Sequence, residues 1–300
     1  MALVGLVTRD VNVPELPEVE TVRRGLHELV IGKIICRVEH DTPKSFPNAT
    51  EDVRQFLIGT TVIDVRRRAK VLMIDLSTQY TLVVHLKMTG QLVFRGKSSF
   101  GAGHPNDSLI GELPDRSTRV TIFFEDGSHL YFNDQRKFGW MKLMPTAEVP
   151  NLAFMQKVGP EPLRDDFTAQ QFAERFKRRA KTSIKAALLD QTVVAGVGNI
   201  YADESLWGAK IHPKRLVASL TPKEFKALYI ELRKVMNLAI EKGGSTDKNY
   251  VNAEGRRGSY MDFARVFRRE GLPCPRCGTT IIKFKAAGRG THICPYCQVL

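Results

Sequence analysis

Apolar residues near the start of the chain recur at helical spacing. These residues are Val19, Val22, Leu26, Leu29 and Val30. Successive residues are three or four positions apart, except for the adjacent Leu29 and Val30. The segment that leads into them, residues 14–20, reads Pro-Glu-Leu-Pro-Glu-Val-Glu. Pro17 suits a first helical turn, and Glu18 and Glu20 suit the positive end of a helix dipole. The pattern predicts a proline-started, acid-capped helix that packs inward, and taken alone it indicates structure rather than chemistry.

Strand-like runs dominate residues 34–142. The runs rich in β-branched and aromatic residues are 62–65, 71–76, 81–86, 120–124 and 129–132. The sequence Glu-Asp-Gly-Ser at 125–128 provides hairpin chemistry between the last two runs. Residues 97–116 are polar, contain glycine and lack periodicity, so we expect a mobile loop there. The first half of the chain is predicted to be a β-sandwich or a flattened barrel.

Helical patterns take over in the second half. Residues 145–164 are rich in proline and show little periodicity, which indicates a hinge between two domains. Capping boxes follow at Thr168 with Gln171 and at Thr221 with Glu224. Each precedes apolar residues at helical spacing, and we assign these residues to the core of a second, helical domain.

Two glycine-containing segments of the second half have more than one interpretation. Gly196 and Gly198 precede a helix that begins near Asn199, and the free N–H groups of such a helix end can hold a phosphate. A tight turn between two helices is the alternative. Residues 245–260 are polar and predict a flexible loop, which serves either as a substrate lid or as a linker.

Two Cys-x2-Cys pairs near the C-terminus are the most specific signal in the sequence. They consist of Cys274, Cys277, Cys294 and Cys297. Two thiolate pairs supply closed tetrahedral coordination, so we expect one structural Zn²⁺ rather than disulfides in a reducing compartment. Between the pairs, segment 288–291 would present Arg289 at the tip of a two-stranded ribbon. The remaining cysteine, Cys36, is predicted to be a small buried hydrophobic residue.

Composition and charge narrow the class of protein. The 300 residues are 43% hydrophobic, enough for two domains with cores, and no apolar run approaches membrane-spanning length. The apolar segment 1–7 lacks the flanks of a secretory signal, so we expect a cytoplasmic protein. Residues 1–163 hold 20 basic and 19 acidic residues (+1), and residues 164–300 hold 25 and 13 (+12), which together give the net charge of +13. This asymmetry favours a polyanion such as nucleic acid over an unpartnered basic surface.

Six segments, in order along the chain, carry a resemblance to a known family. They are residues 14–20, 68–70 (Arg-Ala-Lys), 85–90 (His-Leu-Lys-Met-Thr-Gly), 133–139 (Asn-Asp-Gln-Arg-Lys-Phe-Gly), 196–204 and the cysteine segment with 288–292 (Gly-Arg-Gly-Thr-His). On these motifs the chain resembles the formamidopyrimidine-DNA glycosylases, bacterial repair enzymes for oxidised guanine. The resemblance implies an α+β multidomain fold: an N-terminal β-sandwich, a helix-two-turn-helix domain and a four-cysteine zinc ribbon.

The resemblance also implies how the chain divides. The expected parts are an extension absent from the mature enzyme at 1–13, a catalytic helix with β-sandwich at 14–144, the hinge at 145–164, the DNA-binding helix-two-turn-helix domain at 165–265 and the zinc ribbon at 266–300. We expect a monomer that acts on damaged double-stranded DNA. Its expected location is the bacterial cytoplasm, at the nucleoid and not at a membrane.

The chemistry of the family transfers to four positions of this sequence. Its nucleophile is the secondary amine of an N-terminal proline, which matches Pro14, and an α-amine is partly unprotonated at neutral pH. Glu15 matches the acid/base residue and Lys70 a lysine near the lesion, while Glu18 matches a supporting carboxylate. The resemblance thus implies a bifunctional enzyme. It would excise 8-oxoguanine and formamidopyrimidines through a Schiff base and then cut the strand by β,δ-elimination.

Further residues match positions that contact DNA in the family. Met88, Arg136 and Phe138 match the side chains that fill the gap left by an extruded base. The other matches are His85, Lys137, the phosphate-binding residues Asn199 and Arg289, and the lesion-loop residues Asn252, Gly255, Ser259 and Tyr260. Lys137 stands where relatives often carry arginine, and it still offers a phosphate contact.

One feature departs from the family pattern. Pro14 is internal, so its nitrogen forms an amide with Val13 and cannot act as a nucleophile. We hypothesise that translation starts at position 13, because a GTG codon can initiate as methionine, which is then removed. Two alternatives stay open. One is an endonuclease VIII-like glycosylase for oxidised pyrimidines; the other is a non-catalytic, zinc-dependent DNA-binding protein, if the extension is retained.

Overall fold

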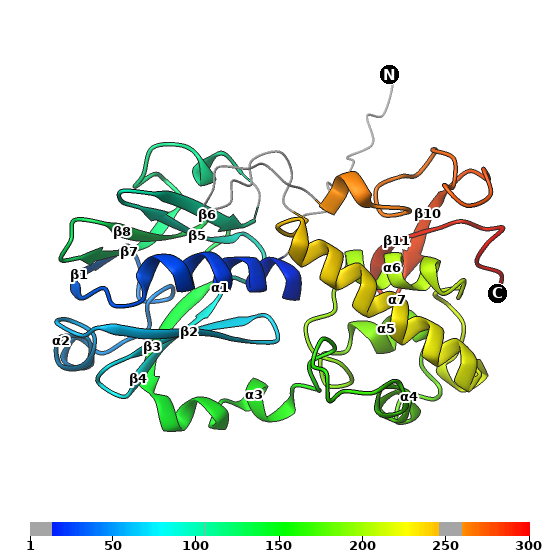
Figure 1. Ribbon diagram of the computed structural model, residues 1–300, viewed down its shortest axis with the longest axis horizontal. Helices are drawn as coiled ribbons and strands as arrows, with labels where there is room; N and C mark the ends of the chain where they lie inside the picture. The colour runs from blue at the N-terminus through cyan, green and yellow to red at the C-terminus, as the bar shows by residue number, and fades with distance from the viewer. Residues whose placement is uncertain (1–13, 105, 246–259) are drawn as a thin grey trace, which may run out of the picture.

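Helix α1 (Leu16–Val30) joins the two halves of the molecule. The computed structural model describes residues 14–104, 106–245 and 260–300. As predicted, α1 starts at an acidic cap, in which Glu15 and Glu18 form a reciprocal capping box. Leu16 packs into the core of the helical half, whereas Val19 packs into the β-sandwich. Figure 1 shows the start of α1 beside α7 (Pro222–Glu241).

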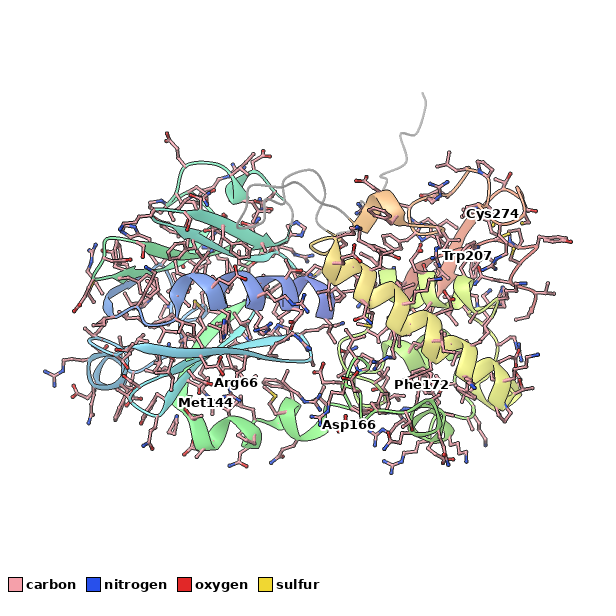
Figure 2. The ribbon with its side chains drawn as sticks, viewed as in Figure 1. Arg66, Met144, Asp166, Phe172, Trp207 and Cys274 are labelled. Atoms are coloured by element: carbon pink, nitrogen blue, oxygen red, sulfur yellow. The ribbon has the colours of Figure 1, made fainter. Side chains whose placement is uncertain are left out.

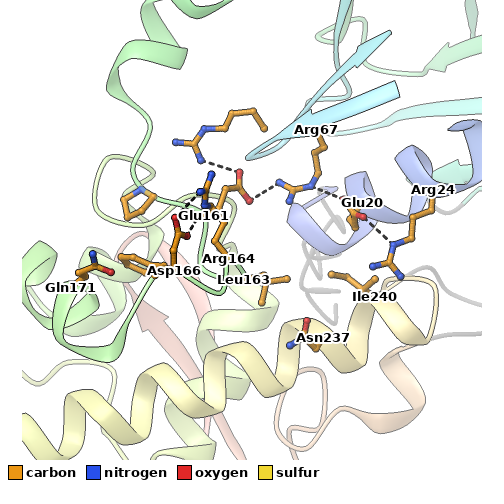
Figure 3. A pocket seen from close by; sticks show the side chains of 13 residues that line it. Glu20, Arg24, Arg67, Glu161, Leu163, Arg164, Asp166, Gln171, Asn237 and Ile240 are labelled. Carbon is orange, nitrogen blue, oxygen red and sulfur yellow. Dashed lines mark hydrogen bonds and ion pairs between the residues drawn. The ribbon is translucent and has the colours of Figure 1, made fainter. Parts of the chain in front are cut away.

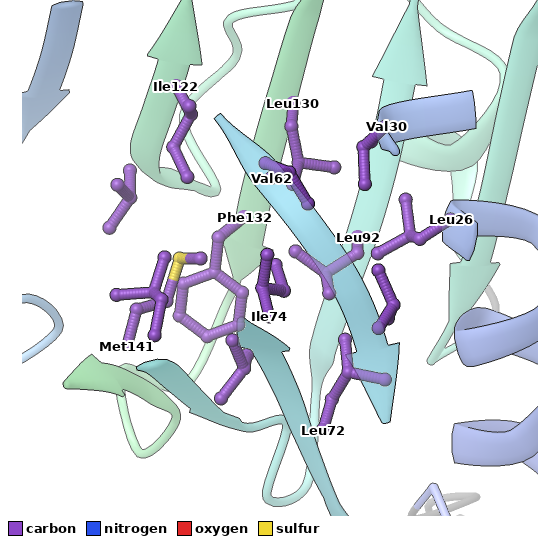
Figure 4. Close-up of a cluster of buried hydrophobic side chains, with 14 of the residues drawn as sticks. Leu26, Val30, Val62, Leu72, Ile74, Leu92, Ile122, Leu130, Phe132 and Met141 are labelled. Atoms are coloured by element: carbon purple, nitrogen blue, oxygen red, sulfur yellow. The ribbon is translucent and has the colours of Figure 1, made fainter. Parts of the chain in front are cut away.

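Two antiparallel sheets form the predicted sandwich, with strand orders β1-β7-β8-β5-β6 and β2-β3-β4-β9. The first sheet contains β1 (Ile35–His40), β5 (Gly90–Arg95), β6 (Ser99–Gly103), β7 (Thr118–Phe124) and β8 (His129–Asp134). The second contains β2 (Val62–Arg68), β3 (Val71–Leu76), β4 (Tyr80–His85) and β9 (Trp140–Pro145). Apolar side chains of both sheets and α1 meet between them, as Figure 4 shows for Leu26, Leu72, Leu92 and Phe132.

The predicted loop at 97–116 contains a strand, so that prediction was wrong. Strand β6 pairs with β5, and a short 3₁₀ helix, η1 (Asp107–Leu109), follows it. Its sequence, Ser-Phe-Gly-Ala-Gly, gives no strand signal because glycine and alanine weaken the pattern. Tertiary packing stabilises it instead: Phe100 is buried against α1, where a Cβ on Gly25 would lie 2.2 Å from its ring.

Cys36 is exposed, which corrects the prediction of a buried residue. It lies in β1 on the outward face of the sheet, and its Sγ stands 3.4 Å from the carbonyl oxygen of Phe123 on β7. The alternation of a strand explains the difference, because the neighbouring Ile35 takes the inward position.

Short helices occupy the predicted hinge. They are η2 (Thr146–Asn151) and α3 (Ala153–Lys157), and Val149 packs beside Val83 and Met144 of the four-stranded sheet. A further helix that the pattern did not indicate, α2 (Thr50–Phe56), has no buried residue. Val53 and Phe56 are partly buried against the sandwich core, but two apolar positions in a helix of 7 residues give only a weak helical pattern.

Helices form the second half, as predicted. They are α4 (Ala169–Lys177), α5 (Ile184–Leu189), α6 (Asn199–Gly208) and α7, with 3₁₀ segments η3 (Val217–Ser219) and η4 (Tyr260–Phe263). Both predicted capping boxes are present, at the starts of α4 and α7. A second apolar core, which includes Phe172, Phe176, Leu228 and Met236, fills this half. Within the described residues, no helix is long and apolar enough to cross a membrane.

The predicted two-stranded ribbon closes the fold. Strands β10 (Ile282–Ala286) and β11 (Arg289–Ile293) pair antiparallel, and Ala287 and Gly288, both with positive φ, form the turn between them. Trp207 of α6 packs in one apolar cluster with Cys274 and Cys294, and Figure 2 shows Trp207 near Cys274. The ribbon is therefore fixed to the helical half.

Candidate active site

The Glu15 carboxyl group lies at the contact between the two halves. Only 4% of this residue is exposed, and Oε1 accepts a 3.4 Å hydrogen bond from the backbone N–H of Ile200 at the start of α6. A Cβ on Gly198 would lie 2.0 Å from the Glu15 Cδ atom, so this position must be glycine. Sequence reasoning expected the glycines to admit a phosphate or a tight turn. In the structure, Gly198 admits the Glu15 carboxyl group.

Burial also changes the ionisation of Glu15. It raises the pKa of the carboxyl group to about 8, and the nearby Lys70 ammonium opposes that rise. Oε2 of Glu15 is buried and has no hydrogen-bond partner among the described residues. A carboxyl group in this state is protonated near neutral pH, so it can donate a proton to a group placed beside it.

Glu18 connects α1 to two segments of the helical half. One oxygen accepts the Glu15 backbone N–H at 2.8 Å. The other accepts the Tyr201 hydroxyl at 2.5 Å and the Ser245 backbone N–H at 2.7 Å. The carboxylate is buried with three donors around it, so it holds the start of α1 against the helical half.

Lys70 enters the site from the turn between β2 and β3. Its Nζ donates a 3.1 Å hydrogen bond to the carbonyl of Val197, in the segment that leads to Gly198. Burial lowers the pKa of the Lys70 ammonium, and the carboxyl groups of Glu15 and Glu18 oppose that change. The Lys70 ammonium therefore lies at the contact between the two halves, near the Glu15 carboxyl group.

Pro14 precedes these groups and is buried. In the chain as printed its nitrogen belongs to the amide with Val13, and residues 1–13 lie outside the described part of the structure. The expectation of absence from the mature enzyme concerns these residues alone. Pro14 directly precedes Glu15, the N-cap residue of α1.

Asn199 and Arg289 also meet at this site. Nδ2 of Asn199 donates a 3.0 Å hydrogen bond to the carbonyl of Gly290, which follows Arg289 in the ribbon. Arg289 is exposed, and its charge is close enough to lower the pKa of Lys70. Oδ1 of Asn199 is buried and lacks a hydrogen-bond partner among the described residues. The helix start and the ribbon turn thus present polar groups to the same space.

Met88, Arg136 and Phe138 lie on two adjoining loops of the sandwich. Phe138 is 43% exposed, the Arg136 guanidinium lies 5.0 Å from its ring centre, and Met88 is half-buried. Lys137, between the two, is exposed and has positive φ. An exposed aromatic ring beside a guanidinium suits insertion into a base stack.

Sequence reasoning missed the residue that holds these loops, Asp134. It is fully buried and accepts hydrogen bonds from the hydroxyl of Thr89 and from the backbone N–H groups of Phe138 at 2.8 Å and Gly139 at 2.6 Å. The Arg136 N–H lies 3.0 Å from the Thr89 hydroxyl. A signal was present, because a carboxylate within a turn often binds nearby backbone N–H groups.

His85 is a neutral aromatic residue near the site. Burial, with the charges of Lys87 and Lys70, lowers the pKa of its imidazole to about 3. Nδ1 accepts the backbone N–H of Lys87 at 3.1 Å, and the ring lies close to Trp140. In the protein without DNA, the imidazole of His85 is therefore uncharged near neutral pH.

The proposed lesion loop is only partly described. Asn252, Gly255 and Ser259 lie outside the described residues. Tyr260 is buried in the helical core, where its hydroxyl donates to Glu204 at 3.3 Å and its N–H to Gly244 at 2.9 Å. Its side chain thus anchors the end of this segment in the core.

The four cysteines of the ribbon fit a tetrahedral metal ion. All four Sγ atoms lie within 4.8 Å of one another, and Cys274 and Cys294 are buried. Four thiolates at such separations suit Zn²⁺, whose bonds to sulfur are about 2.3 Å long. With four protein ligands no coordination position is left for a substrate, so an ion held here is structural.

Comparisons with known proteins agree with this geometry. Three family profiles match: "Formamidopyrimidine-DNA glycosylase N-terminal domain" at residues 13–141, "Formamidopyrimidine-DNA glycosylase H2TH domain" at 158–250 and "Zinc finger found in FPG and IleRS" at 271–299. The chain is thus a helix-two-turn-helix DNA glycosylase, an enzyme with glycosylase and AP-lyase activities and a zinc-finger ribbon that holds one structural Zn²⁺. It belongs to the formamidopyrimidine-DNA glycosylase family.

Individual relatives cover nearly the whole chain. Formamidopyrimidine-DNA glycosylases of Pediococcus pentosaceus and Streptococcus mutans are each 43% identical over 287 residues, which is 96% and 95% of this chain and 99% of each relative. A solved complex between the Lactococcus lactis enzyme and DNA with an abasic site has a TM-score of 0.84 and 35% identity, and covers 95% of this chain and 100% of that one. A complex of a Lactococcus lactis mutant with Fapy-dG DNA has the same TM-score, 36% identity, and coverage of 96% and 100%.

Proposed function

We propose that this chain excises 8-oxoguanine and formamidopyrimidines from damaged duplex DNA and then cuts the strand at the resulting site. The observation that carries this proposal is the buried Glu15 carboxyl group, which lies next to Pro14 and faces Lys70 at the junction of the two halves. Relatives that support it include the Lactococcus lactis enzyme in complexes with DNA that contains Fapy-dG or an abasic site.

Pro14 is the proposed nucleophile, once residues 1–13 are absent and its nitrogen is a free secondary amine. The amine attacks C1′ of the damaged nucleotide, the C1′–N bond to the base breaks, and the base leaves with a proton. Opening of the sugar ring gives an iminium ion between Pro14 and C1′. The iminium acidifies the C2′ hydrogen, so loss of that proton expels the 3′ phosphate, and a second elimination expels the 5′ phosphate.

Glu15 and Lys70 handle the protons and charge in this proposal. Because burial raises the pKa of Glu15 to about 8, the carboxyl group holds a proton near neutral pH and can donate it to the sugar ring oxygen or the departing base. The Lys70 ammonium carries a positive charge that attracts a phosphate, so we place it against the DNA backbone or the lesion.

DNA is held around this site by exposed groups of both halves. Arg136, Phe138 and Met88 occupy the gap that the extruded base leaves, and Lys137 contacts a phosphate. Asn199 and Arg289 bind phosphates beside the flipped nucleotide. We further propose that the enzyme acts as a monomer in the bacterial cytoplasm.

Borohydride trapping tests the proposal, because borohydride reduces an enzyme–DNA iminium to a stable crosslink. The substrate is a duplex with one 8-oxoguanine opposite cytosine, and the proteins are the 300-residue chain and a form that begins at Pro14. We expect a crosslink with the Pro14 form alone. A crosslink with neither form, while zinc content and DNA binding are intact, would favour the non-catalytic DNA-binding protein.

A second substrate separates the two glycosylase classes. One Lactococcus lactis complex contains DNA with an oxidised pyrimidine, so such a base is the natural competitor. Single-turnover excision should be faster for 8-oxoguanine than for an oxidised pyrimidine in the same sequence context. The reverse order would assign the chain to the endonuclease VIII-like class.

A further inference from the structure

A polar cavity of about 770 Å³ lies where the end of β2 meets the segment that enters the helical half. Figure 3 shows its charged wall, which includes Glu20, Arg67 and Glu161. Glu161 accepts hydrogen bonds from three residues, although no motif or proposed step assigns it a role. The residue is 8% exposed, so its carboxylate is not a surface charge.

Glu161 binds the turn between β2 and β3. Oε1 accepts the backbone N–H of Ala69 at 2.5 Å and the Arg68 guanidinium at 3.1 Å. Oε2 accepts the Arg67 guanidinium at 2.8 Å. The two oxygens thus hold the last two residues of β2 and the first residue of the turn, and the next residue is Lys70.

The backbone of Ala69 needs such support. Its φ is +52°, in the left-handed region that is unfavourable for a non-glycine residue. Both backbone polar groups of Ala69 are held in this conformation. Glu161 accepts its N–H, and the Arg67 guanidinium donates to its carbonyl at 2.9 Å. These contacts fix the direction in which the following residue leaves the turn.

The segment that carries Glu161 is also bound to the opposite wall of the active site. The N–H of Gly159 donates to the carbonyl of Gln191 at 2.8 Å, and the carbonyl of Pro160 accepts the N–H of Ala195 at 2.9 Å. Val197, whose carbonyl accepts the Lys70 ammonium at 3.1 Å, lies two residues after Ala195. Glu161 and the acceptor of Lys70 therefore belong to one hydrogen-bonded unit.

The same network reaches α1. Arg67 donates to Glu20 of α1 at 3.0 Å as well as to Glu161, and both carboxylates and this guanidinium are largely buried. Helix α1 carries Glu15 at its start. Three segments that meet at the active site are thus held in register by ion pairs outside it.

We propose that Glu161 is a positioning residue, which sets the Lys70 ammonium against Glu15 by holding Ala69 in its left-handed conformation. This inference rests on the proposed function of Lys70 in the active site. Glu161 itself lies behind the turn, on the cavity side, so it is not expected to contact DNA.

The pKa of Glu15 reports the position of Lys70 without any need for catalysis. Because the Lys70 charge lowers that pKa, displacement of the ammonium should raise it. We would titrate carbon-13-labelled glutamate carboxyl groups by NMR, with the Glu15 signal assigned through Glu15→Gln. Lys70→Met should raise the pKa of Glu15, and Glu161→Gln should move it in the same direction. In the Lys70→Met background, Glu161→Gln should have no further effect.

Excision kinetics provide the second readout, in the form of the chain that gives the borohydride crosslink. Glu161→Gln keeps the size of the side chain but loses its charge, and we expect single-turnover excision to fall by about 10- to 100-fold, as for other misplaced groups. Ala69→Gly in the same chain should restore part of the rate, because glycine adopts positive φ without support. If Glu161→Gln alone folds poorly, the double variant with Ala69→Gly should fold better, because glycine removes the backbone strain at position 69.

Asp166→Asn is the matched control, since it removes a carboxylate from the same cavity whose partner is Arg164. It should leave both readouts unchanged. An unchanged Glu15 pKa in folded Glu161→Gln would overturn the inference, as would an equal further rate loss in the Lys70→Met background. Absence of crosslinking by the unmutated form that begins at Pro14 would contradict the proposed function instead, and the NMR titration would still decide the role of Glu161.

Discussion

At the scale of single residues, the site depends on one carboxyl group removed from water. Glu15 is buried by the glycine at 198 and by the start of α6, and this burial raises its pKa to about 8. Its neighbour Glu18 has three hydrogen-bond donors, whereas Oε2 of Glu15 has none among the described residues. The two glutamates, three positions apart, thus differ. The Glu18 carboxylate stabilises the start of α1, whereas the Glu15 carboxyl group stays protonated near neutral pH.

The raised pKa of Glu15 predicts how stability depends on pH. Below about pH 4.5 the carboxyl group is protonated in both the folded and the unfolded chain. Between 4.5 and 8 the unfolded chain ionises first, so the folded state holds more protons and the free energy of unfolding falls as pH rises. Urea denaturation of the 300-residue chain and of its Glu15→Gln variant, at pH 5 and pH 8, measures this effect. The decline should be smaller in Glu15→Gln, and equal declines would contradict the prediction.

At the scale of elements, buried side chains hold the loops that we propose to face DNA. The loops with Met88 and Arg136 come from different strands, and Asp134 joins them through the Thr89 hydroxyl. The resemblance at residues 133–139 indicated functions only for the exposed Arg136, Lys137 and Phe138. The side chain that shapes this turn is the buried carboxylate of Asp134.

Asp134→Asn should weaken this pair of loops. An amide replaces one acceptor oxygen by a donor that faces backbone N–H groups, and an unsatisfied buried group costs about 1–3 kcal/mol. We expect a lower free energy of unfolding and a weaker affinity for duplex DNA that contains an abasic-site analogue. Asp52→Asn, on the exposed α2, is the control and should change neither. Unaltered DNA affinity in the Asp134 variant would show that the loops keep their shape without this carboxylate.

Patterns of residues close together in sequence predicted some elements and could not predict others. The start of α1, both capping boxes and the ribbon with its cysteines follow from residues close together in sequence. Strand β6 and the exposure of Cys36 depend on which neighbour lies across the sheet, so no local pattern contained them. The sequence indicated that the backbone at Gly198 could come close to another group. That group, the Glu15 carboxyl, lies 183 positions earlier in the sequence, and only the fold brings them together.

At the scale of the whole molecule, charge and chemistry are divided between the halves. Pro14, Glu15 and Lys70 belong to a half with a charge of +1, whereas the second half carries +12 and adds Asn199 and Arg289. Phosphate contacts should therefore come mainly from the second half, with the chemistry placed against its surface.

This division predicts the salt dependence of DNA binding. Each phosphate contact contributes about 0.9 to the slope of log affinity against log salt concentration. Arg289→Gln should reduce the steepness by about one such contact, because its guanidinium faces the proposed phosphate path. Arg54→Gln, in the nearly neutral first half and paired with Glu51, should leave the slope unchanged. Fluorescence anisotropy with a labelled duplex from 50 to 300 mM salt measures both slopes, and identical slopes for all three proteins would contradict the assignment of Arg289.

The position of Leu16 has a consequence for the order in which the enzyme becomes active during synthesis. Leu16 completes the core of the helical half, so the first turn of α1 cannot find its place until residues beyond 200 have left the ribosome and folded. The packing around the first turn of α1 is thus completed by residues that are synthesised much later. A nascent chain has no formed site around Glu15, and catalytic competence arises only as synthesis ends.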